Sequence, residues 1–159
     1  MHTTSKKGRY GRIRQQLSDL LSKPGNQLSR MATIAAVLHH KMPGFFWTGF
    51  YLLDGDELIV GPYQGPAACQ LLEKDKGVCW AAIRREESVL VPDVHQFPGH
   101  IACDSRSQSE IVVPVRDPGG KLIGVLDVDS KQLDAFDETD REGLEQIVAL
   151  LAANSSPKG

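Results

Sequence analysis

The spacing of apolar residues changes near residue 44, and this change constrains the fold more than any other feature of the chain. Before it, apolar residues recur every three or four positions, which predicts two amphipathic helices separated by Pro24-Gly25. Asn26 is a suitable N-terminal cap for the second helix, which we expect to reach about His40. The expected buried stripes are Ile13, Leu17, Leu20 and Leu21 in the first helix, and Leu28, Met31, Ala35 and Leu38 in the second.

Beyond that point the pattern predicts two β-hairpins and a closing helix capped by Asp137. The hairpins are expected at 45–53 and 57–64, joined by the turn 54–56, and at 110–115 and 121–129, joined by the turn 117–120. Shorter elements are expected at 68–72 (strand), 77–87 (helix) and 88–94 (strand). An irregular loop covers residues 92–108, and such loops in compact domains are usually functional. This succession predicts an α+β fold in which helices, mostly from the two termini, pack on an antiparallel sheet.

Composition places the chain among ordinary globular proteins. With 159 residues we expect one domain over 10–153, between flexible ends at 1–9 and 154–159. A net charge of −2 gives no attraction to nucleic acid or to an anionic membrane, and the basic residues near the N-terminus suit a solvated end. No apolar run approaches the ~20 residues of a membrane span, and no apolar signal region is visible. We therefore expect a cytoplasmic location.

The three cysteines are Cys69, Cys79 and Cys103, an odd number that argues against a structural disulfide framework. Cys103 lies in the long polar loop between His100 and Asp104, where solvent and substrate could reach it and where nearby charge could tune its thiolate. The other two cysteines offer disulfide partners. The alternative is that these residues are small buried hydrophobes, and the position of Cys103 alone leaves both interpretations open.

Two further groups of residues could form a pocket. Trp47 and Tyr51 point to the same face of their strand, with Gly49 between them leaving room for something to approach the sheet. Asp127 and Asp129 also share one face of their strand. The simpler explanation of Trp47 and Tyr51 is an aromatic pair in the core, and that of Asp127 and Asp129 is the solvated face of a strand. If these carboxylates and that of Glu110 share a concave face with Cys103, however, they form an acidic pocket for an ammonium group, and a desolvated carboxyl there could donate a proton.

Metal ligation is the competing interpretation of the long loop, which contains Asp93, His95, His100, Cys103 and Asp104. No second Cys/His pair completes a closed zinc site, so we expect no metal. The chain also has no P-loop, no glycine-rich dinucleotide motif and no Gly-x-Ser-x-Gly elbow, so phosphate-cradling and serine-hydrolase chemistry have no support.

Several segments occur together in the order found in one protein family. They are Trp47-Thr-Gly-Phe-Tyr-Leu-Leu53, Gly61-Pro-Tyr-Gln-Gly65, Lys76-Gly-Val-Cys79, Val91-Pro-Asp-Val-His95, Phe97-Pro-Gly-His-Ile-Ala-Cys103, Ser109-Glu-Ile-Val-Val-Pro114 and Gly124-Val-Leu-Asp-Val-Asp129. Over residues 10–152 the chain resembles the free methionine-(R)-sulfoxide reductases, which are built on a GAF domain. The resemblance implies a six-stranded antiparallel sheet flanked by N- and C-terminal helices, and a homodimer. One departure is Trp80, where a small residue is expected after Cys79.

The resemblance also implies roles for individual residues. Cys103 is the nucleophile, Cys69 the resolving cysteine, and Cys79 a third thiol that is the alternative resolving residue. The substrate would contact an aromatic wall of Trp47 and Tyr51 and an acidic pocket of Glu110, Asp127 and Asp129. Free methionine-(R)-sulfoxide would be reduced through a sulfenic acid and a disulfide, with thioredoxin as the external reductant and no bound cofactor. The alternatives are a GAF sensor that binds a small molecule and a cysteine-based peroxide sensor.

Overall fold

Six strands and five helical segments make up the part of the chain that the computed structural model describes, residues 3–100 and 103–153. In chain order they are α1 (Thr3–Leu21), α2 (Gln27–Lys41), β1 (Trp47–Asp54), β2 (Glu57–Gln64), β3 (Leu71–Leu72), α3 (Gly77–Arg85), β4 (Val89–Val91), the 3₁₀ helix η1 (Val94–Gln96), β5 (Ser109–Arg116), β6 (Leu122–Ser130) and α4 (Glu138–Ala153). Both expected hairpins, β1–β2 and β5–β6, are present.

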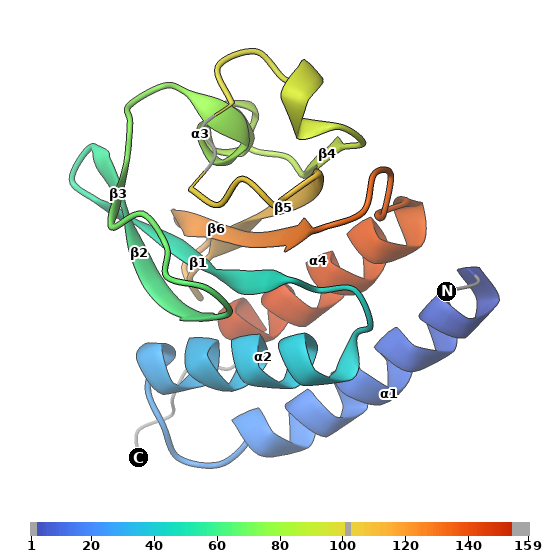
Figure 1. Ribbon diagram of the computed structural model, residues 1–159. Helices are drawn as coiled ribbons and strands as arrows, with labels where there is room; N and C mark the ends of the chain where they lie inside the picture. Colours follow the sequence, from blue (N-terminus) through green and yellow to red (C-terminus); the bar gives the residue numbers. More distant parts are fainter. Residues whose placement is uncertain (1–2, 101–102, 154–159) are drawn as a thin grey trace.

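The strands form one antiparallel sheet in the order β3-β2-β1-β6-β5-β4 (Figure 1). The first strand pairs with the last, so the two hairpins join side by side through β1 and β6. The six-stranded antiparallel sheet that the family resemblance implied is therefore confirmed. The β1–β2 ladder is irregular between Gly49 and Tyr51, and the β5–β6 ladder is irregular near Arg116.

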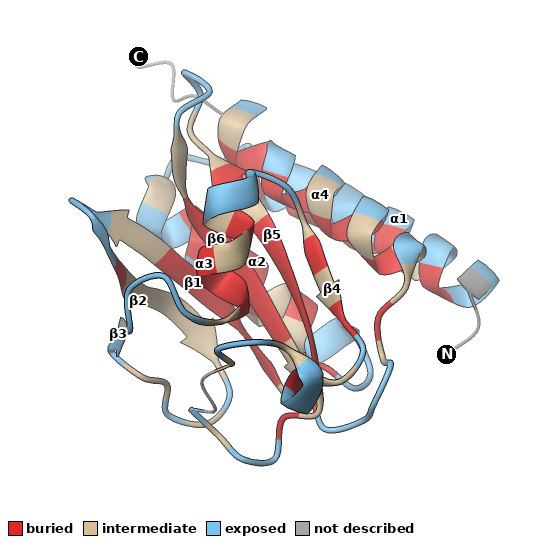
Figure 2. Ribbon diagram, turned by 90° about the horizontal axis from the view of Figure 1, so that it is seen from above, coloured by how far each residue is buried: buried red, intermediate tan, exposed pale blue. Residues whose placement is uncertain are grey.

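The two faces of the sheet are covered differently. Helices α2 and α4 pack on one face and α1 packs on these two helices, whereas α3, η1 and the long connecting segments cover the other face (Figure 1). Side chains that alternate along the strands fill both layers: Phe50 and Leu126 join the core beneath the three long helices, while Tyr51 and Val125 join the core beneath α3. The middle of the sheet is buried on both sides (Figure 2). No helix in the described ranges has both the length and the apolar character needed to cross a bilayer.

Two leucines lie outside the buried stripes to which their spacing assigned them. Leu20 is 44% exposed and Leu28 is 62% exposed. The stripe of buried residues in α1 continues through Ile13, Leu17 and Leu21, each four residues apart, so Leu20 points to the side of that stripe. Leu28 lies in the first turn of α2 and is exposed, although Met31 and Ala35 on the same stripe are buried. The expected cap is confirmed, because the Asn26 side chain accepts a hydrogen bond from the Ser29 backbone N–H and Ser29 Oγ accepts one from the Asn26 backbone N–H.

The N-terminal residues are helical from Thr3 onward, whereas the sequence placed residues 1–9 in a flexible end. The reason is a long-range ion pair: Lys6 is only 8% exposed, and its Nζ lies 2.6 Å from Asp140 Oδ2 in α4. Tyr10 donates a hydrogen bond of 2.6 Å to the other oxygen of that carboxylate. The predicted Asp137 cap of α4 is confirmed by a 3.0 Å hydrogen bond from the Thr139 N–H. Residues 1–2 and the expected flexible end at 154–159 lie outside the described ranges.

We expect Asp140→Ala to lower the free energy of unfolding by about 3–5 kcal/mol, because the buried Lys6 ammonium loses its closest carboxylate and keeps only the longer 3.5 Å pair with Asp137. Urea denaturation monitored by far-UV circular dichroism measures the change. The control is Glu73→Ala, which removes an ion pair with Lys76 in which both side chains are exposed and should cost less than ~1 kcal/mol. Equal, small losses in both variants would show that the buried pair does not hold α1 against α4.

Candidate functional site

A cavity of about 60 Å³ lies on the sheet face beneath α3, between that helix, the strands β1, β5 and β6, and the segment around Cys103. It is lined by all the candidate residues except Cys69: Trp47, Tyr51, Cys79, Cys103, Glu110, Asp127 and Asp129. The fold therefore brings together residues from both hairpins, the helix between them and the long loop. The volume corresponds to roughly two water molecules.

Stacked aromatic rings form one wall of the cavity. The Trp47 ring lies 5.7 Å from that of Tyr51 and 5.1 Å from that of Tyr63, and both pairs are nearly parallel. The same rings hold the segment that carries Cys69. Trp47 Nε1 donates to the Pro66 carbonyl at 3.0 Å, and the Tyr51 hydroxyl donates to the Cys69 carbonyl at 3.3 Å. The aromatic wall therefore also positions one of the cysteines.

Sequence reasoning assigned no role to Tyr63, which β2 places opposite Gly49 of β1. A Cβ on Gly49 would collide with Tyr63 and lie 2.8 Å from the Trp47 ring, so the space predicted at this glycine is filled by two aromatic side chains. The signal that could have found Tyr63 is the register of the first hairpin. The turn alone does not fix that register because the ladder is irregular between Tyr51 and Gly49.

Three carboxylates occupy the floor of the cavity. Glu110 pairs with Asp129 across β5 and β6, while Asp127 pairs with Gly49 on one side and with Val112 on the other. Glu110 and Asp127 are only 6% and 5% exposed, so the simpler explanation of a solvated face is wrong. Helix α3 covers these residues, and Asp127 Oδ1 is buried without a hydrogen-bond partner in the described structure.

Burial changes the protonation of these groups. It raises the pKa of Glu110 well above its usual range, and the charges of Asp127 and Asp129 raise it further. Burial also raises the pKa of Asp127 to about 6, although hydrogen bonding from Glu110 and Cys79 opposes this shift. The pKa of Asp129 is raised by burial and by the charge of Asp127. Near neutral pH the cavity therefore favours an ionised Asp127 beside a protonated Glu110, which places an anion and a proton donor together.

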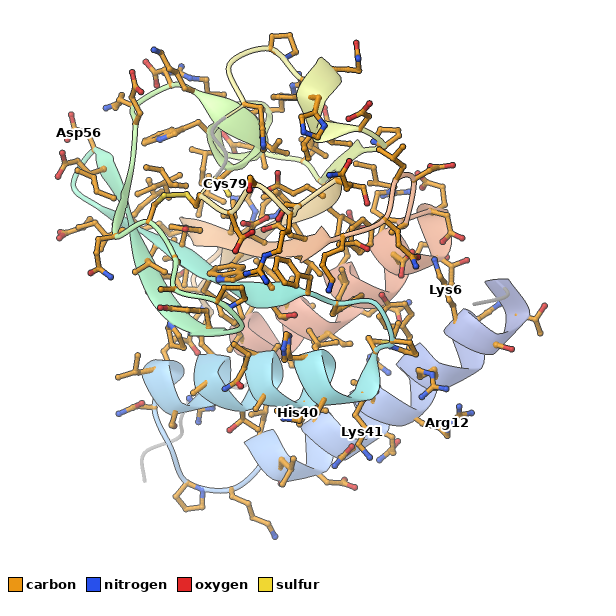
Figure 3. All side chains as sticks on the ribbon, viewed as in Figure 1. Lys6, Arg12, His40, Lys41, Asp56 and Cys79 are labelled. Carbon is orange, nitrogen blue, oxygen red and sulfur yellow. A yellow bond between two sulfur atoms is a disulfide. The ribbon has the colours of Figure 1, made fainter. Side chains whose placement is uncertain are left out.

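The cysteines occupy two different environments. Cys69 and Cys103 form a disulfide, with Cys103 exposed and Cys69 partly exposed. The alternative that Cys103 is a core residue is therefore wrong. Cys79 is a buried free thiol in the first turn of α3, beneath the helix (Figure 3), and burial raises its pKa. The accessible redox pair is thus Cys69–Cys103, whereas the Cys79 thiol faces the carboxylates.

The possible metal ligands of the loop 92–108 do not come together around one point. Asp93 pairs with His95 at 3.0 Å, Asp104 pairs with Arg106, and Cys103 is in the disulfide. Among the described residues, the closest group of potential ligands is instead Cys79, Glu110 and Asp127, whose donor atoms lie within 4.8 Å of one another. Burial raises the pKa of all three groups, so each holds its proton to a higher pH than an exposed group of the same type.

Two neighbouring residues complete the description of the site. His100 lines the cavity, and burial lowers its pKa, so its imidazole is neutral near pH 7. Trp80, the departure from the family pattern, packs in the core beneath α3 and does not line the cavity. Because successive residues of a helix point in different directions, Cys79 can face the acids while Trp80 faces the apolar core.

The comparisons with known proteins agree with this architecture. The model of the GAF domain family matches residues 30–154. The free methionine-R-sulfoxide reductase of Escherichia coli (strain K12) is 39% identical over 142 residues, which cover 89% of this chain and 86% of that protein. The structure of the free methionine-R-sulfoxide reductase from Neisseria meningitidis in complex with its substrate is 41% identical and superposes with a TM-score of 0.88, covering 93% of this chain and 89% of that one.

A second solved reductase gives the same result. The fRMsr of Staphylococcus aureus in its reduced form is 42% identical, with a TM-score of 0.86 over 91% of this chain and 93% of that one. These similarities extend over nearly the whole chain. The chain therefore belongs to the GAF-domain family and, within it, to the free methionine-R-sulfoxide reductases.

Proposed function

We propose that this protein reduces free methionine-(R)-sulfoxide to methionine, with Cys103 as the nucleophile. The observation that carries this proposal is the convergence of three features on one cavity: an accessible Cys69–Cys103 disulfide, a stacked aromatic wall and a set of buried carboxylates. The proposed reaction needs a thiol, an apolar surface and a proton donor, and the cavity supplies all three.

In the first step the Cys103 thiolate attacks the sulfoxide sulfur. Glu110, which burial keeps protonated, donates its proton to the departing oxygen, and the products are methionine and a Cys103 sulfenic acid. The Cys69 thiol then condenses with the sulfenic acid, which forms the disulfide and releases water. An external dithiol reduces that disulfide by thiol–disulfide exchange and restores both thiols, so the cycle transfers two electrons to the substrate.

The cavity also supports an orientation for the substrate. The unpaired Oδ1 of Asp127 suits the α-ammonium group, and Trp47 and Tyr51 suit the methyl group and sulfur. Substrate binds to the reduced form, in which Cys69 and Cys103 are free thiols, and closure of the loop 92–108 over the substrate then excludes water.

For the recycling partner and the assembly we rely on the family resemblance. We propose thioredoxin as the reductant, a homodimer as the assembly and the cytoplasm as the location. A cysteine-based peroxide sensor is the second candidate, because the exposed disulfide would also suit reaction with peroxide. A coupled assay with thioredoxin, thioredoxin reductase and NADPH separates the two: NADPH oxidation should depend on the (R)-sulfoxide, and turnover with peroxide alone would favour the sensor.

The substrate should be the free amino acid. Acetylation of the α-amino group removes its charge and leaves the buried carboxylates unpaired, so kcat/KM should fall by up to ~10⁴-fold for N-acetylated (R)-sulfoxide. The free (S) epimer should also react poorly, since its oxygen points away from Glu110. The coupled assay compares the three compounds at equal concentration. Comparable kcat/KM for the free and acetylated (R) forms would disprove the ammonium site.

The two bridged cysteines should be distinguishable by their kinetics. Cys103→Ser should abolish reduction, because a serine hydroxyl is not ionised near neutral pH and cannot replace the thiolate. Cys69→Ser should still form about one methionine per subunit in a single turnover, but steady-state recycling should be slow because the sulfenic acid has lost its partner. Amino-acid analysis of quenched samples measures both quantities. Unchanged steady-state turnover in Cys69→Ser would assign the resolving role to Cys79.

The activity should depend on pH through Asp127. The ammonium group binds the ionised carboxylate, whose pKa burial raises to about 6, so kcat/KM should fall as the pH drops below that value. Asp127→Asn should lower kcat/KM and remove this acidic limb, since an amide does not titrate. The measurement is kcat/KM against pH for both proteins. An acidic limb of the same midpoint in Asp127→Asn would assign it to another group.

A further inference from the structure

Arg106 connects the Cys103 segment, residues 103–107, into a compact unit. Its Nε donates to Asp104 Oδ1 at 3.0 Å and its Nη2 donates to Asp104 Oδ2 at 2.7 Å. The Arg106 backbone N–H donates to the same Oδ1 at 2.9 Å. A two-pronged pair of this kind has a fixed orientation, because the planar guanidinium matches the carboxylate. Arg106 therefore determines the position of the residue that directly follows Cys103.

The same guanidinium attaches this segment to the sheet. Its carbon lies 4.9 Å from the centroid of the Phe46 ring, which is within the range of a cation–π contact. Phe46 directly precedes Trp47, and its backbone N–H donates to the Asp129 carbonyl at 2.8 Å. Arg106 thus links the Cys103 segment to the end of β1 that also carries the aromatic wall and borders the acidic floor.

The pairing also has an electrostatic consequence for Cys103. Asp104 lines the same cavity, and Arg106 holds the pKa of that carboxyl down to about 2, so it is ionised wherever the enzyme would work. A carboxylate beside a thiol disfavours the thiolate, and a cation paired with the carboxylate offsets the effect. The other titratable or charged groups that line the cavity around Cys103 are Tyr51, Lys76, Cys79, His100, Glu110, Asp127 and Asp129, and Lys131 lies near Asp104.

We propose that Arg106 is a positioning residue for Cys103: its ion pair with Asp104 offsets the negative charge next to the thiol, and its contact with Phe46 holds the segment over the cavity. The inference rests on the proposed role of Cys103 as the nucleophile. It assigns a function to a residue that lies outside the lining of the cavity and acts only through its two neighbours.

Alkylation of Cys103 by iodoacetamide tests the electrostatic part without any sulfoxide. The Cys69→Ser background leaves Cys103 without its disulfide partner, and digestion with mass spectrometry separates its modification from that of the buried Cys79. In Arg106→Ala we expect the pH midpoint of alkylation to rise by about half a unit, which slows the reaction about threefold near neutral pH. Arg106→Lys keeps the charge and should retain most of the reactivity.

A double variant separates charge from packing. Asp104→Asn combined with Arg106→Ala removes both charges, so the midpoint should return to that of the Cys69→Ser background. Phe46→Leu keeps the ion pair and removes the ring. It should leave the midpoint in place while raising KM in the coupled assay about two- to fivefold, the scale of an exposed cation–π contact. Thermal melting of each variant checks that the fold is retained.

The matched control is Arg84→Ala, which removes another exposed arginine with a carboxylate partner, Asp75, and neither residue lines the cavity. The proposal is overturned if Arg106→Ala and Arg84→Ala have the same midpoint, or if the double variant keeps the full shift. It is also overturned if Arg106→Ala changes only the melting temperature. Should the wild-type protein fail to reduce the sulfoxide, alkylation still reports on Cys103, so the two failures are distinguishable.

Discussion

The pairing of β1 with β6 is the contact on which the rest of the structure depends. It joins the two hairpins into one sheet and places Trp47 opposite Asp129 and Gly49 opposite Asp127. Alternation along these strands then sends Phe50 and Leu126 into the core beneath the three long helices. The β1–β6 hydrogen bonds therefore give the sheet two different faces. One face is apolar and packs in the core beneath the three long helices, and the opposite face carries the aromatic and acidic groups of the cavity.

The acidic floor is unfavourable for folding taken alone. A buried acceptor without a partner costs about 1–3 kcal/mol, and Asp127 Oδ1 is such an acceptor. Burial raises the pKa of Glu110, Asp127 and Asp129 together, so the cluster lowers its own cost by keeping protons that exposed carboxyls would release. The same protons serve the proposed reaction, since Glu110 can give one to a departing oxygen while the free oxygen of Asp127 receives an ammonium group. Desolvation of these carboxyl groups therefore opposes folding, but it also raises the pKa of Glu110 and so provides the proton that the proposed reaction needs.

The sequence predicts the features that follow from local periodicity, such as which residues share a face of a strand. It does not predict the features that depend on contacts between residues far apart in the chain. The common face of Trp47 and Tyr51 follows from the two-residue period of a strand. The position of Tyr63 could not be predicted because it depends on an irregular ladder. The early start of the N-terminal helix could not be predicted because Lys6 contacts Asp140 only in the folded chain. Leu28 was misplaced because a helical spacing of apolar residues does not say which edge of the stripe a neighbouring helix covers.

The Cys69–Cys103 bond joins two loops, one after β2 and one before β5, through cysteines that are 34 residues apart, and Cys103 lines the cavity. Both loops are also tied to the aromatic end of the sheet, through the Tyr51 hydroxyl at Cys69 and through Phe46 at Arg106. In the proposed cycle this bridge marks a completed turnover and also links the two loops covalently. Reduction by an external dithiol would free the Cys103 thiol and remove that link in one event, so the form with a free nucleophile is also the form in which the two loops are no longer joined.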